Sequence, residues 1–449
     1  MIREGLPHTC YALRITLRRT ALKSQINIGF IGLGTVGSGG LKVLLDNKNE
    51  IERKVGSQVE VVKIADLDII TERPVKFDKG LLTTDVNEVL DNPDVDILVE
   101  LIGGVHPAKE FILRALRNGK HVVTANKELI AKEGSEIFDE ASSRKLDFYF
   151  EGAVGGGIPI IRPLKTCLAA NKIQEVMGIV NGTTNYILTK MADEGRDFRE
   201  VLAEAQKAGY AEADPTSDVE GYDAKYKIAI LASIAFTSRV SVDDIYAEGI
   251  TRIAPQDIQY AGELGYVVKL LAIAKRTGEE IQARVHPTLI PLTHPLASVG
   301  DVYNAIYMRG DFAQDVMFYG RGAGSLPTGS AVAGDIMDIA RNINFGSNGR
   351  LPCTCFDRRQ VQSMDLLETR YYMRMLVADK PGVFASIASV FGEQNVSIAS
   401  VVQKDSQGDK AEIVMVTHRV AERNFRAAIE QIARLPVVSE VCNWIRVEE

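Results

Sequence analysis

Cysteine is scarce in this sequence, and its scarcity limits what can hold the fold together. The chain contains only Cys10, Cys167, Cys353, Cys355 and Cys442. These residues are too few and too scattered for a disulfide framework, so we expect a cytoplasmic protein with reduced thiols. Cys353 and Cys355 flank one threonine, and no second Cys/His pair stands at zinc-site spacing. That pattern argues against a structural metal at this pair.

Long apolar runs and an excess of positive charge are also lacking. No run approaches the roughly eighteen apolar residues that a membrane-spanning helix needs, so we expect no membrane partner. Lys and Arg number 52 against 59 Asp and Glu, a net charge of −7, and no basic stripe appears. That balance argues against a nucleic-acid partner. The remaining composition, 46% apolar and 25% charged over 449 residues, suits a soluble protein of about two or three domains.

Residues 1–25 differ from the rest because they are basic and contain a single acid, Glu4. Their only apolar stretch is interrupted by Arg14, which excludes the apolar core of a secretory signal. Serine is nearly absent, which argues against an organellar transit peptide. We therefore expect a disordered extension, or one that begins upstream of the true start, with the fold proper starting at Ile26.

Residues 26–150 alternate short apolar runs with helical patterns. The expected strands are INIGFIG, VEVVKIAD, VDILVELIG, KHVVTAN and LDFYF, and the expected helices are 36–50, 106–118 and 128–143. Strand–helix alternation with apolar strands predicts a parallel, doubly wound α/β sheet. The first strand runs into Gly32, Gly34 and Gly37, which have the G-x-G-x-x-G spacing of a dinucleotide-binding turn.

The end of the second expected strand bears on the choice of cofactor. Asp66 stands there, and an acid at this place would bond a ribose 2′-hydroxyl and repel a 2′-phosphate, which favours NAD. We expect Arg73, the nearest following base, to be too distant to accommodate NADP. The interval from Gly37 to Asp66 exceeds the usual spacing, so the choice between NAD and NADP stays open.

The segment EADPTSDVEGYDAKYK, Glu212 to Lys227, concentrates acids ahead of two lysines. Asp223 and Lys227 are four apart and share one helical face, with the acid N-terminal to the base. Lys227 also begins an apolar stripe with the spacing of a buried helix face. A lysine at the wet end of such a stripe is a candidate for proton transfer to a carbonyl oxygen. The alternative is a snorkelling lysine paired with a surface acid.

Six motifs in one order extend this signal. They are TANKE, EGAVGGGIPII, VNGTTNYIL, GYAEADPTSDVEGYDAKYK, ELGYVVKLLAIA and FYGRGAGSLPTGSAV, and they span about residues 26–341. In this order the chain resembles the homoserine dehydrogenases. The resemblance implies reversible conversion of L-homoserine to L-aspartate 4-semialdehyde with NADP or NAD, in threonine, methionine and isoleucine biosynthesis. It also implies a homodimer or higher homo-oligomer, formed through a sheet of the central domain.

The resemblance assigns roles near the reacting oxygen. Lys227 matches the general acid/base, and Lys127 matches the second lysine of the site. Glu212 and Asp223 match acids that bind the substrate. Asn181, Thr183 and Thr184 offer neutral hydrogen bonds to it, although a turn whose side chains bond one another explains these three equally well.

The glycine-rich segments carry further assignments. EGAVGGGIPI is similar to a monovalent-cation (Na+) loop, in which Glu151 would give a side-chain oxygen and Val154, Gly156 and Ile158 would give carbonyls. A glycine-rich hinge is the alternative. Gly322 and Gly324 match a loop that approaches the cofactor from the far side. The residues that the resemblance assigns to the cofactor are Gly32, Leu33, Gly34, Thr35, Val36, Gly37, Asp66, Gly103, Lys127, Gly209 and Gly324.

The last eighty or so residues read as a separate module. Their expected order is β-α-β-β-α-β, which is ferredoxin-like. With Asp379, Lys380, Pro381 and Gly382 at the first turn, the module resembles an ACT domain, which implies an amino-acid effector such as threonine. A packing module without a ligand is the alternative.

The expected organisation is therefore an N-terminal doubly wound (Rossmann) domain, an α+β substrate and dimerisation domain, and a C-terminal ACT domain. Their expected ranges are 26–150 with a return helix at about 328–341, 151–327, a linker at 342–369, and 370–449. Two rival functions are another Rossmann amino-acid dehydrogenase and a non-catalytic amino-acid-sensing regulator. The first has no reason to carry the EADP…DAKYK and NGTTN segments, and the retained lysines and acids argue against the second.

Overall fold

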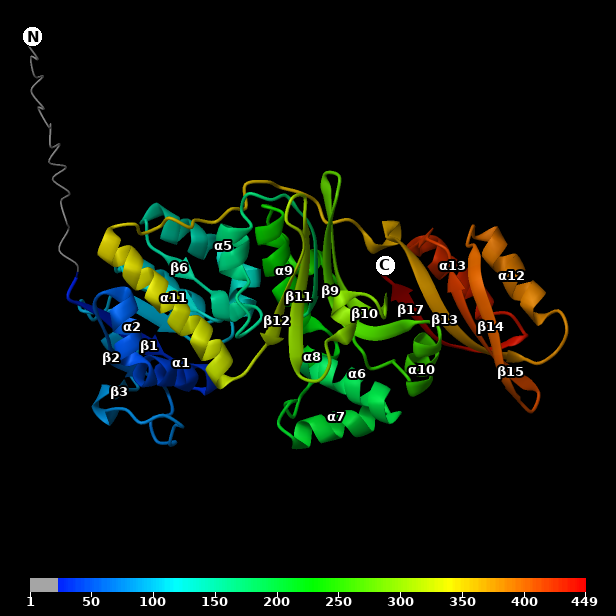
Figure 1. Ribbon diagram of the computed structural model, residues 1–449, viewed down its shortest axis with the longest axis horizontal. Helices are drawn as coiled ribbons and strands as arrows, with labels where there is room; N and C mark the ends of the chain where they lie inside the picture. Colours follow the sequence, from blue (N-terminus) through cyan, green and yellow to red (C-terminus); the bar gives the residue numbers. More distant parts are fainter. Residues whose placement is uncertain (1–22) are drawn as a thin grey trace, which may run out of the picture.

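The computed structural model describes residues 23–449, so nearly all of the extension expected at 1–25 lies outside the described residues. Figure 1 shows three parts along the long axis, which we call the nucleotide domain, the central domain and the C-terminal module. Within 23–449 no helix combines the length and the apolar character that crossing a membrane requires.

The nucleotide domain contains a six-stranded parallel sheet in the order β3-β2-β1-β4-β5-β6, which confirms the predicted doubly wound fold. Its strands are apolar because helices cover both faces. Its elements are β1 (Gln25–Ile31), α1 (Thr35–Asp46), α2 (Lys48–Val55), β2 (Gln58–Ala65), η1 (Lys79–Leu81), β3 (Leu82–Thr83), α3 (Asn87–Leu90), β4 (Ile97–Glu100), α4 (Ala108–Arg117), β5 (His121–Thr124), α5 (Lys127–Ser143) and β6 (Phe148–Tyr149).

Two elements of this domain differ from expectation. The single helix expected at 36–50 is two helices, α1 and α2, which meet at Asn47 because its backbone leaves the helical region (φ −103°, ψ 15°). The extra helix explains why the interval from Gly37 to Asp66 is long. The last expected strand, LDFYF, is reduced to Phe148–Tyr149 at the sheet edge.

Helix α11 (Ser325–Phe345) returns to the nucleotide domain and crosses α1 closely (Figure 1). Ile336 and Ile339 are buried with the strands of that domain, where the resemblance implied a return helix. The two helices meet through glycine. A Cβ atom on Gly39 would lie 2.0 Å from the carbonyl oxygen of Ser325, and one on Gly329 would lie 2.5 Å from the carbonyl carbon of Gly39. Only glycine therefore permits this crossing.

The central domain joins helices to one face of a mixed sheet. The strands run β12-β11-β7-β9-β10 and are antiparallel to their neighbours. The elements are η2 (Glu151–Ala153), η3 (Pro163–Cys167), β7 (Ile173–Ile179), α6 (Gly182–Glu194), α7 (Phe198–Lys207), α8 (Thr216–Val219), α9 (Tyr222–Ala235), η4 (Val242–Asp244), β8 (Tyr246–Ala247), α10 (Pro255–Glu263), β9 (Tyr266–Thr277), β10 (Glu280–Pro291), η5 (Pro295–Ser298), β11 (Tyr303–Gly310) and β12 (Gln314–Arg321).

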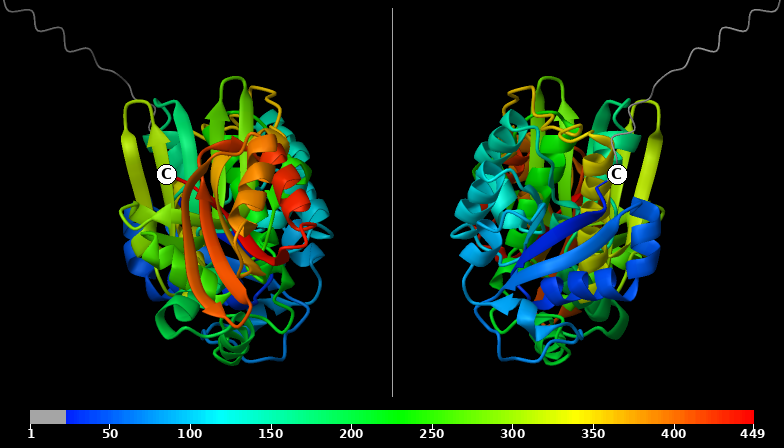
Figure 2. Two further views of the ribbon diagram at one scale, coloured as in Figure 1. Left: turned by 90° about the vertical axis from the view of Figure 1, so that its right-hand side faces the viewer. Right: turned by 90° about the vertical axis from the view of Figure 1, so that its left-hand side faces the viewer.

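The C-terminal module has the predicted β-α-β-β-α-β order. Its strands lie β17-β13-β15-β14, and Figure 2 shows its two helices together on one face. Its elements are β13 (Glu368–Ala378), α12 (Val383–Glu393), β14 (Ile398–Gln407), β15 (Lys410–Thr417), β16 (Val420–Ala421), α13 (Glu422–Ile432) and β17 (Val438–Val447), after a short turn η6 (Met364–Leu366).

The module is joined to the central domain by the pairing of two strands and by a buried carboxylate. Strand β17 pairs with β10 at Thr288–Arg446 and Leu289–Val447, so one sheet runs through both parts. Asp257 of α10 is fully buried and accepts hydrogen bonds from Arg374 at 2.6 Å and from Asn443 at 2.8 Å. A buried carboxylate bound in this way ties the module firmly to α10.

Candidate active site

The glycine-rich turn between β1 and α1 has the backbone that its sequence requires. Gly32 has φ +97°, and a Cβ there would lie 2.8 Å from the main chain of Leu101. A Cβ on Gly37 would lie 2.2 Å from the carbonyl oxygen of Gly32. The turn delivers the N-terminus of α1, beginning at Thr35, to the carboxyl edge of the sheet, where a pyrophosphate binds in such folds.

Asp66 follows β2 at the same edge, but its surroundings differ from those we expected. Its carboxylate accepts a hydrogen bond from the backbone N–H of Leu33, within the glycine-rich turn. Arg73 was expected to be too distant, but it lies close to Asp66. Its guanidinium stands 3.6 Å from the Asp66 carboxylate and 3.3 Å from that of Asp68.

A local turn explains why Arg73 lies close to Asp66. The Asp68 side chain accepts from the backbone N–H groups of Ile70 and Thr71, which folds the loop back on itself. Arg73 thus stands beside Asp66 despite six intervening residues in the chain. A guanidinium here can donate hydrogen bonds to a 2′-phosphate, and the Asp66 carboxylate is already engaged by the backbone N–H of Leu33.

The next strand ends supply the far side of the cofactor edge. Gly103, after β4, has φ +75°. Asn126, after β5, donates to the carbonyl of Gly104 at 2.6 Å and caps α5 by accepting from the backbone N–H of Leu129. This cap fixes Lys127 in the first turn of α5, at the carboxyl edge of the sheet.

The centre of the site is Asp223, a buried carboxylate held between two lysines. Its Oδ1 lies 2.5 Å from Nζ of Lys127, and its Oδ2 accepts from Nζ of Lys227 at 2.6 Å. Lys227 also donates to the carbonyl oxygen of Val180 at 2.7 Å. An ammonium has three N–H donors, so one remains for a substrate. Helices α5 and α9, which carry these residues, pack against each other (Figure 1).

The two lysines differ in burial and in pKa. The side chain of Lys227 is 9% exposed, whereas that of Lys127 is 41% exposed. Burial lowers the pKa of Lys227, and the Asp223 carboxylate only partly offsets this. Burial also acts on Lys127, but the charge and hydrogen bond of Asp223, together with the charges of Asp218 and Glu212, outweigh it and raise the pKa of Lys127. Although burial alone would raise the pKa of Asp223, the two ammonium groups hold it below its ordinary value. Lys227 is therefore the lysine that gives up its proton more readily.

Asn181 joins the lysine cluster to a second acid. Its amide donates to Asp223 at 2.9 Å and to Asp218 at 2.7 Å. Burial raises the pKa of Asp218, and this residue had not been singled out from the sequence. The signal was present, since Asp218 lies in the same acidic segment as Asp223. What the sequence could not give is the turn of α8 that brings it to Asn181.

The two threonines are engaged within the fold. Thr183 donates its hydroxyl to the carbonyl of Tyr210 at 2.7 Å, and Thr184 donates to the side-chain oxygen of Asn181 at 3.0 Å. Both therefore position the start of α6 and the acidic segment. This observation favours the alternative of a turn with satisfied side chains for these residues.

Glu212 and Gly209 lie at the rim of the central domain. Glu212 is exposed, and its main-chain carbonyl accepts from the Gln206 side chain at 3.0 Å. Its charge contributes to the raised pKa of Lys127, which places it near the mouth of the site. Gly209 has φ +77° and forms the turn between α7 and the acidic segment.

The glycine-rich loop 151–161 differs from expectation at its one acidic side chain. The Glu151 carboxylate is 2% exposed and accepts hydrogen bonds from the backbone N–H groups of Ile160, Ile161 and Arg162. The Nε of Arg162 lies 3.4 Å away from it. These donors occupy both carboxylate oxygens, so Glu151 offers no free side-chain oxygen. Its carboxylate instead closes the loop.

Three carbonyls of that loop remain available. Within 23–449 the carbonyl oxygens of Val154, Gly156 and Ile158 accept no hydrogen bond, although the residues are buried. The loop also contacts the GRGAG segment, because a Cβ on Gly156 would lie 2.5 Å from the carbonyl oxygen of Gly322. The next residues lead to α11, where Ser325 donates to the carbonyl of Thr35 at 2.7 Å. Gly324 is thereby placed beside the cofactor turn.

Comparisons with known proteins agree with this site. Family models match for a homoserine dehydrogenase NAD-binding domain at residues 32–151, homoserine dehydrogenase at 159–337 and an ACT domain at 371–437. The homoserine dehydrogenase of Synechocystis sp. is 48% identical over 431 residues, covering 94% of this chain and 99% of the relative. That of Bacillus subtilis is 44% identical over 425 residues, covering 94% and 98%.

Solved structures show the same likeness. A homoserine dehydrogenase from Thiobacillus denitrificans superposes with a TM-score of 0.88 at 43% identity, over 95% of this chain and 98% of that one. A hyperthermophilic archaeal homoserine dehydrogenase in complex with NADPH matches with a TM-score of 0.59 at 26% identity, over 70% and 97%.

Proposed function

The chain belongs to the homoserine dehydrogenase family and is an NAD(P)-dependent oxidoreductase, and from this premise we propose that Lys227, Asp223 and Lys127 form its proton-transfer centre. One observation carries the proposal: Asp223 is buried and bridges both lysines at 2.5–2.6 Å. A bound nicotinamide supplies or accepts the hydride. The chain must then manage the charge that hydride transfer leaves on the substrate oxygen.

Lys227 has the chemistry for that task. Hydride addition to an aldehyde carbon leaves an alkoxide, which needs a proton from a group within hydrogen-bond reach. In the reducing direction the Lys227 ammonium donates that proton through its remaining N–H. In the oxidising direction neutral Lys227 accepts it. Lys127, more exposed and more firmly charged, stabilises the oxygen and the Asp223 carboxylate.

The acids around this centre suit an amino-acid substrate. Asp218 and Asp223 converge on Asn181 and offer oxygen acceptors to an ammonium group. Glu212, at the rim, adds negative charge where the substrate enters. We assign these three acids to substrate recognition and Asn181 to orienting them.

The central test is an assay of both directions of the reaction. The purified protein should reduce L-aspartate 4-semialdehyde with NAD(P)H and oxidise L-homoserine with NAD+ or NADP+ at alkaline pH. Folded protein that is inactive with both cofactors would contradict the proposed function. The same reaction class would place the enzyme in the synthesis of threonine, methionine and isoleucine.

We also propose a monovalent cation, with Na+ as the candidate, at the loop that begins with Glu151. Buried carbonyls without hydrogen bonds suit a hard cation, and Val154, Gly156 and Ile158 supply them. The Glu151 carboxylate would close the loop without touching the ion. Sodium chloride should then raise the melting temperature above that in choline chloride at equal ionic strength. Equal melting temperatures in the two salts would remove the cation from the account.

For the oligomer we propose a homodimer through the outer strand of the central sheet. Strand β12 is the terminal strand of that sheet, and Met317 and Tyr319 on it are 40% and 55% exposed. An exposed edge strand with apolar side chains favours covering by a second copy. Light scattering should give a dimer for the native chain and a monomer for Tyr319→Asp. A monomeric native protein would exclude this assembly.

A further inference from the structure

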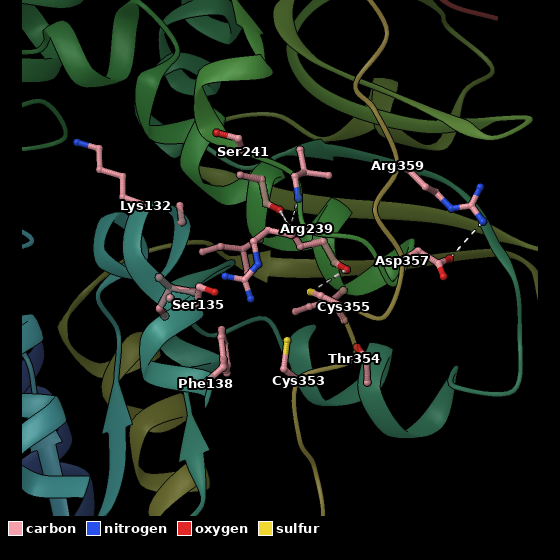
Figure 3. Close-up of a pocket in the computed structure, with 18 of the residues that line it drawn as sticks. Lys132, Ser135, Phe138, Arg239, Ser241, Cys353, Thr354, Cys355, Asp357 and Arg359 are labelled. Atoms are coloured by element: carbon pink, nitrogen blue, oxygen red, sulfur yellow. Dashed lines mark hydrogen bonds and ion pairs between the residues drawn. The ribbon is translucent and has the colours of Figure 1, made fainter. Parts of the chain in front are cut away.

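A cavity of about 570 Å³ lies behind the two helices that carry the catalytic lysines, away from Lys127 and Lys227 themselves. Its walls are α5, the later turns of α9 and residues 353–359 of the segment that leads to the C-terminal module (Figure 3). None of the functions assigned above uses it. Two of the five cysteines of the chain, Cys353 and Cys355, line it.

The two thiols are inequivalent. Both are partly exposed and point into the cavity in Figure 3. Cys355 donates its thiol to the carbonyl oxygen of Ser233 at 3.7 Å. The interaction with the neighbouring Cys355 lowers the pKa of Cys353, and Arg239 and Lys165 add to this effect, whereas the same neighbour and burial raise the pKa of Cys355. Cys353 is therefore the more acidic thiol of the pair.

Positive charge surrounds the pair. The cavity is lined by five basic side chains against two acidic ones. Arg239 projects between Ser135 and the cysteines (Figure 3), and it forms no ion pair within residues 23–449. Lys165 lies along the same wall, where its Nζ donates to the carbonyl oxygen of Leu351 at 3.1 Å. Cationic surroundings stabilise a thiolate and attract an anionic reagent.

We propose that Cys353 and Cys355 form a thiol–disulfide exchange site whose substrates are small disulfides that carry carboxylate groups. The Cys353 thiolate attacks one sulfur of the disulfide, a Cys353–S–S–R bond forms, and the first R–S⁻ leaves. Cys355 then loses its proton to water and attacks the Cys353 sulfur, which expels the second R–S⁻. The pair is oxidised by two electrons to a Cys353–Cys355 disulfide, and the small disulfide is reduced to two thiols.

The cysteine pair lies close to the helices that carry the catalytic residues. A group attached to Cys353 would lie against α5 and α9, whose first two turns hold Lys127, Asp223 and Lys227. The segment that carries the cysteines also leads to the C-terminal module. The site therefore lies between the catalytic helices and the segment that leads to that module.

The test uses dithiobisnitrobenzoate, an anionic aromatic disulfide, on protein in which Cys10, Cys167 and Cys442 are replaced by serine. We expect the chain to release a second equivalent of coloured thiolate, to keep no adduct, and to yield a peptide with the Cys353–Cys355 disulfide. Cys355→Ser, which keeps a hydroxyl donor for the carbonyl of Ser233, should release only the first equivalent and retain the adduct at Cys353. Cys353→Ser should react about tenfold more slowly, or more slowly still.

A second comparison tests the charge preference. Arg239→Gln should slow reaction with the anionic disulfide more than reaction with neutral dithiodipyridine, because the neutral reagent feels only the loss of thiolate stabilisation, and added salt should have the same selective effect. Arg53→Gln is the matched control, because this exposed arginine lies on α2 and not on the cavity.

Three outcomes would overturn the proposal. The native chain could retain the adduct at Cys353. Peptide mapping of the unsubstituted protein would detect this outcome without any variant. The two single cysteine variants could react at equal rates. The anionic and neutral disulfides could respond alike to Arg239→Gln, which would exclude the anionic substrate class.

Discussion

At the scale of single residues, Asp223 sets the properties of both lysines. It is buried, so its charge acts through a medium that screens it poorly. The same carboxylate raises the pKa of Lys127 and holds up the pKa of Lys227 against the effect of burial. The site thus contains one firmly charged lysine and one that can exchange a proton.

This coupling predicts a pH effect for Asp223→Asn. In the reducing direction Lys227 must be protonated, so kcat falls as pH rises through the pKa of Lys227, which burial keeps below its ordinary value. Removing the Asp223 charge lowers that pKa further, because an opposing charge is lost. The alkaline limb of kcat should therefore move to lower pH by about one unit or more. Asp214→Asn, in the same segment but exposed, is the control. An unmoved limb in Asp223→Asn would mean that Lys227 is not the proton donor.

Arg73 supports a second prediction at this scale. Because its guanidinium stands beside Asp66, Arg73→Gln should lower kcat/KM for NADP+ about tenfold or more and change that for NAD+ little. Lys76→Gln, an exposed base on the same loop, should leave both values in place. Equal losses with the two cofactors, measured side by side, would show that Arg73 only supports the loop.

Single residues also show where reading the sequence succeeds and fails. Asp223 and Lys227 could be paired from helical spacing alone, since an interval of four fixes them on one face. Arg73 and the Glu151 carboxylate could not be placed, because a turn at Asp68 and backbone donors nine to eleven residues away decide their partners. Asp218 was missed because α8 brings it to Asn181 by a turn with no periodic signal.

At the scale of elements, close helix packing depends on small residues. Helix α11 crosses α1 at Gly39 and Gly329, and α1 also presents its N-terminus to the cofactor. The spacing of the first glycines predicted the turn, but it did not show that Gly39 faces a helix nearly three hundred residues later. That α11 packs on the nucleotide domain was implied by the family resemblance and not by the apolar spacing of the helix.

This crossing predicts the effect of Gly329→Ala. The added methyl group meets main-chain atoms of α1 at 2.5 Å, so the helices must separate. We expect a loss of about 1–3 kcal/mol in the free energy of unfolding, together with weaker cofactor binding. Gly262→Ala, in α10 with open space around it, should instead be neutral or stabilising by up to about 1 kcal/mol. Denaturant unfolding and NADPH titration measure both. Unchanged stability of Gly329→Ala would show that the crossing is loose.

At the scale of the whole molecule, the C-terminal module is continuous with the catalytic part. Its β17 extends the central sheet, and buried Arg374, Asn443 and Arg446 bond acids of the central domain. The order of elements in the module was readable from the sequence, but this joint was not, because its partners lie far apart in the chain. Deleting the module would remove Arg374 and Asn443 from Asp257 and the pairing of β17 from β10, so a truncated chain is a poor test of regulation.

A point change tests regulation without that damage. The turn at residues 379–382 ends at Gly382, whose φ of +89° opens helix α12. If threonine binds at this turn, Gly382→Ala should raise the half-inhibiting threonine concentration about tenfold, because the methyl group strains the backbone. Gly392→Ala, the same change within α12, has neither a positive φ nor a close neighbour and serves as the control. Native enzyme that ignores threonine would leave the module as a packing domain.

The most direct test of the central claim is the kcat of Lys227→Ala beside that of Lys225→Ala. Lys225 lies on the same helix but faces away from Asp223 and is half-exposed, so its loss should change little. Lys227→Ala should lose about two to four powers of ten in kcat while KM for homoserine changes little. Unchanged kcat with a raised KM would show that Lys227 binds the substrate and transfers no proton, which would contradict the account.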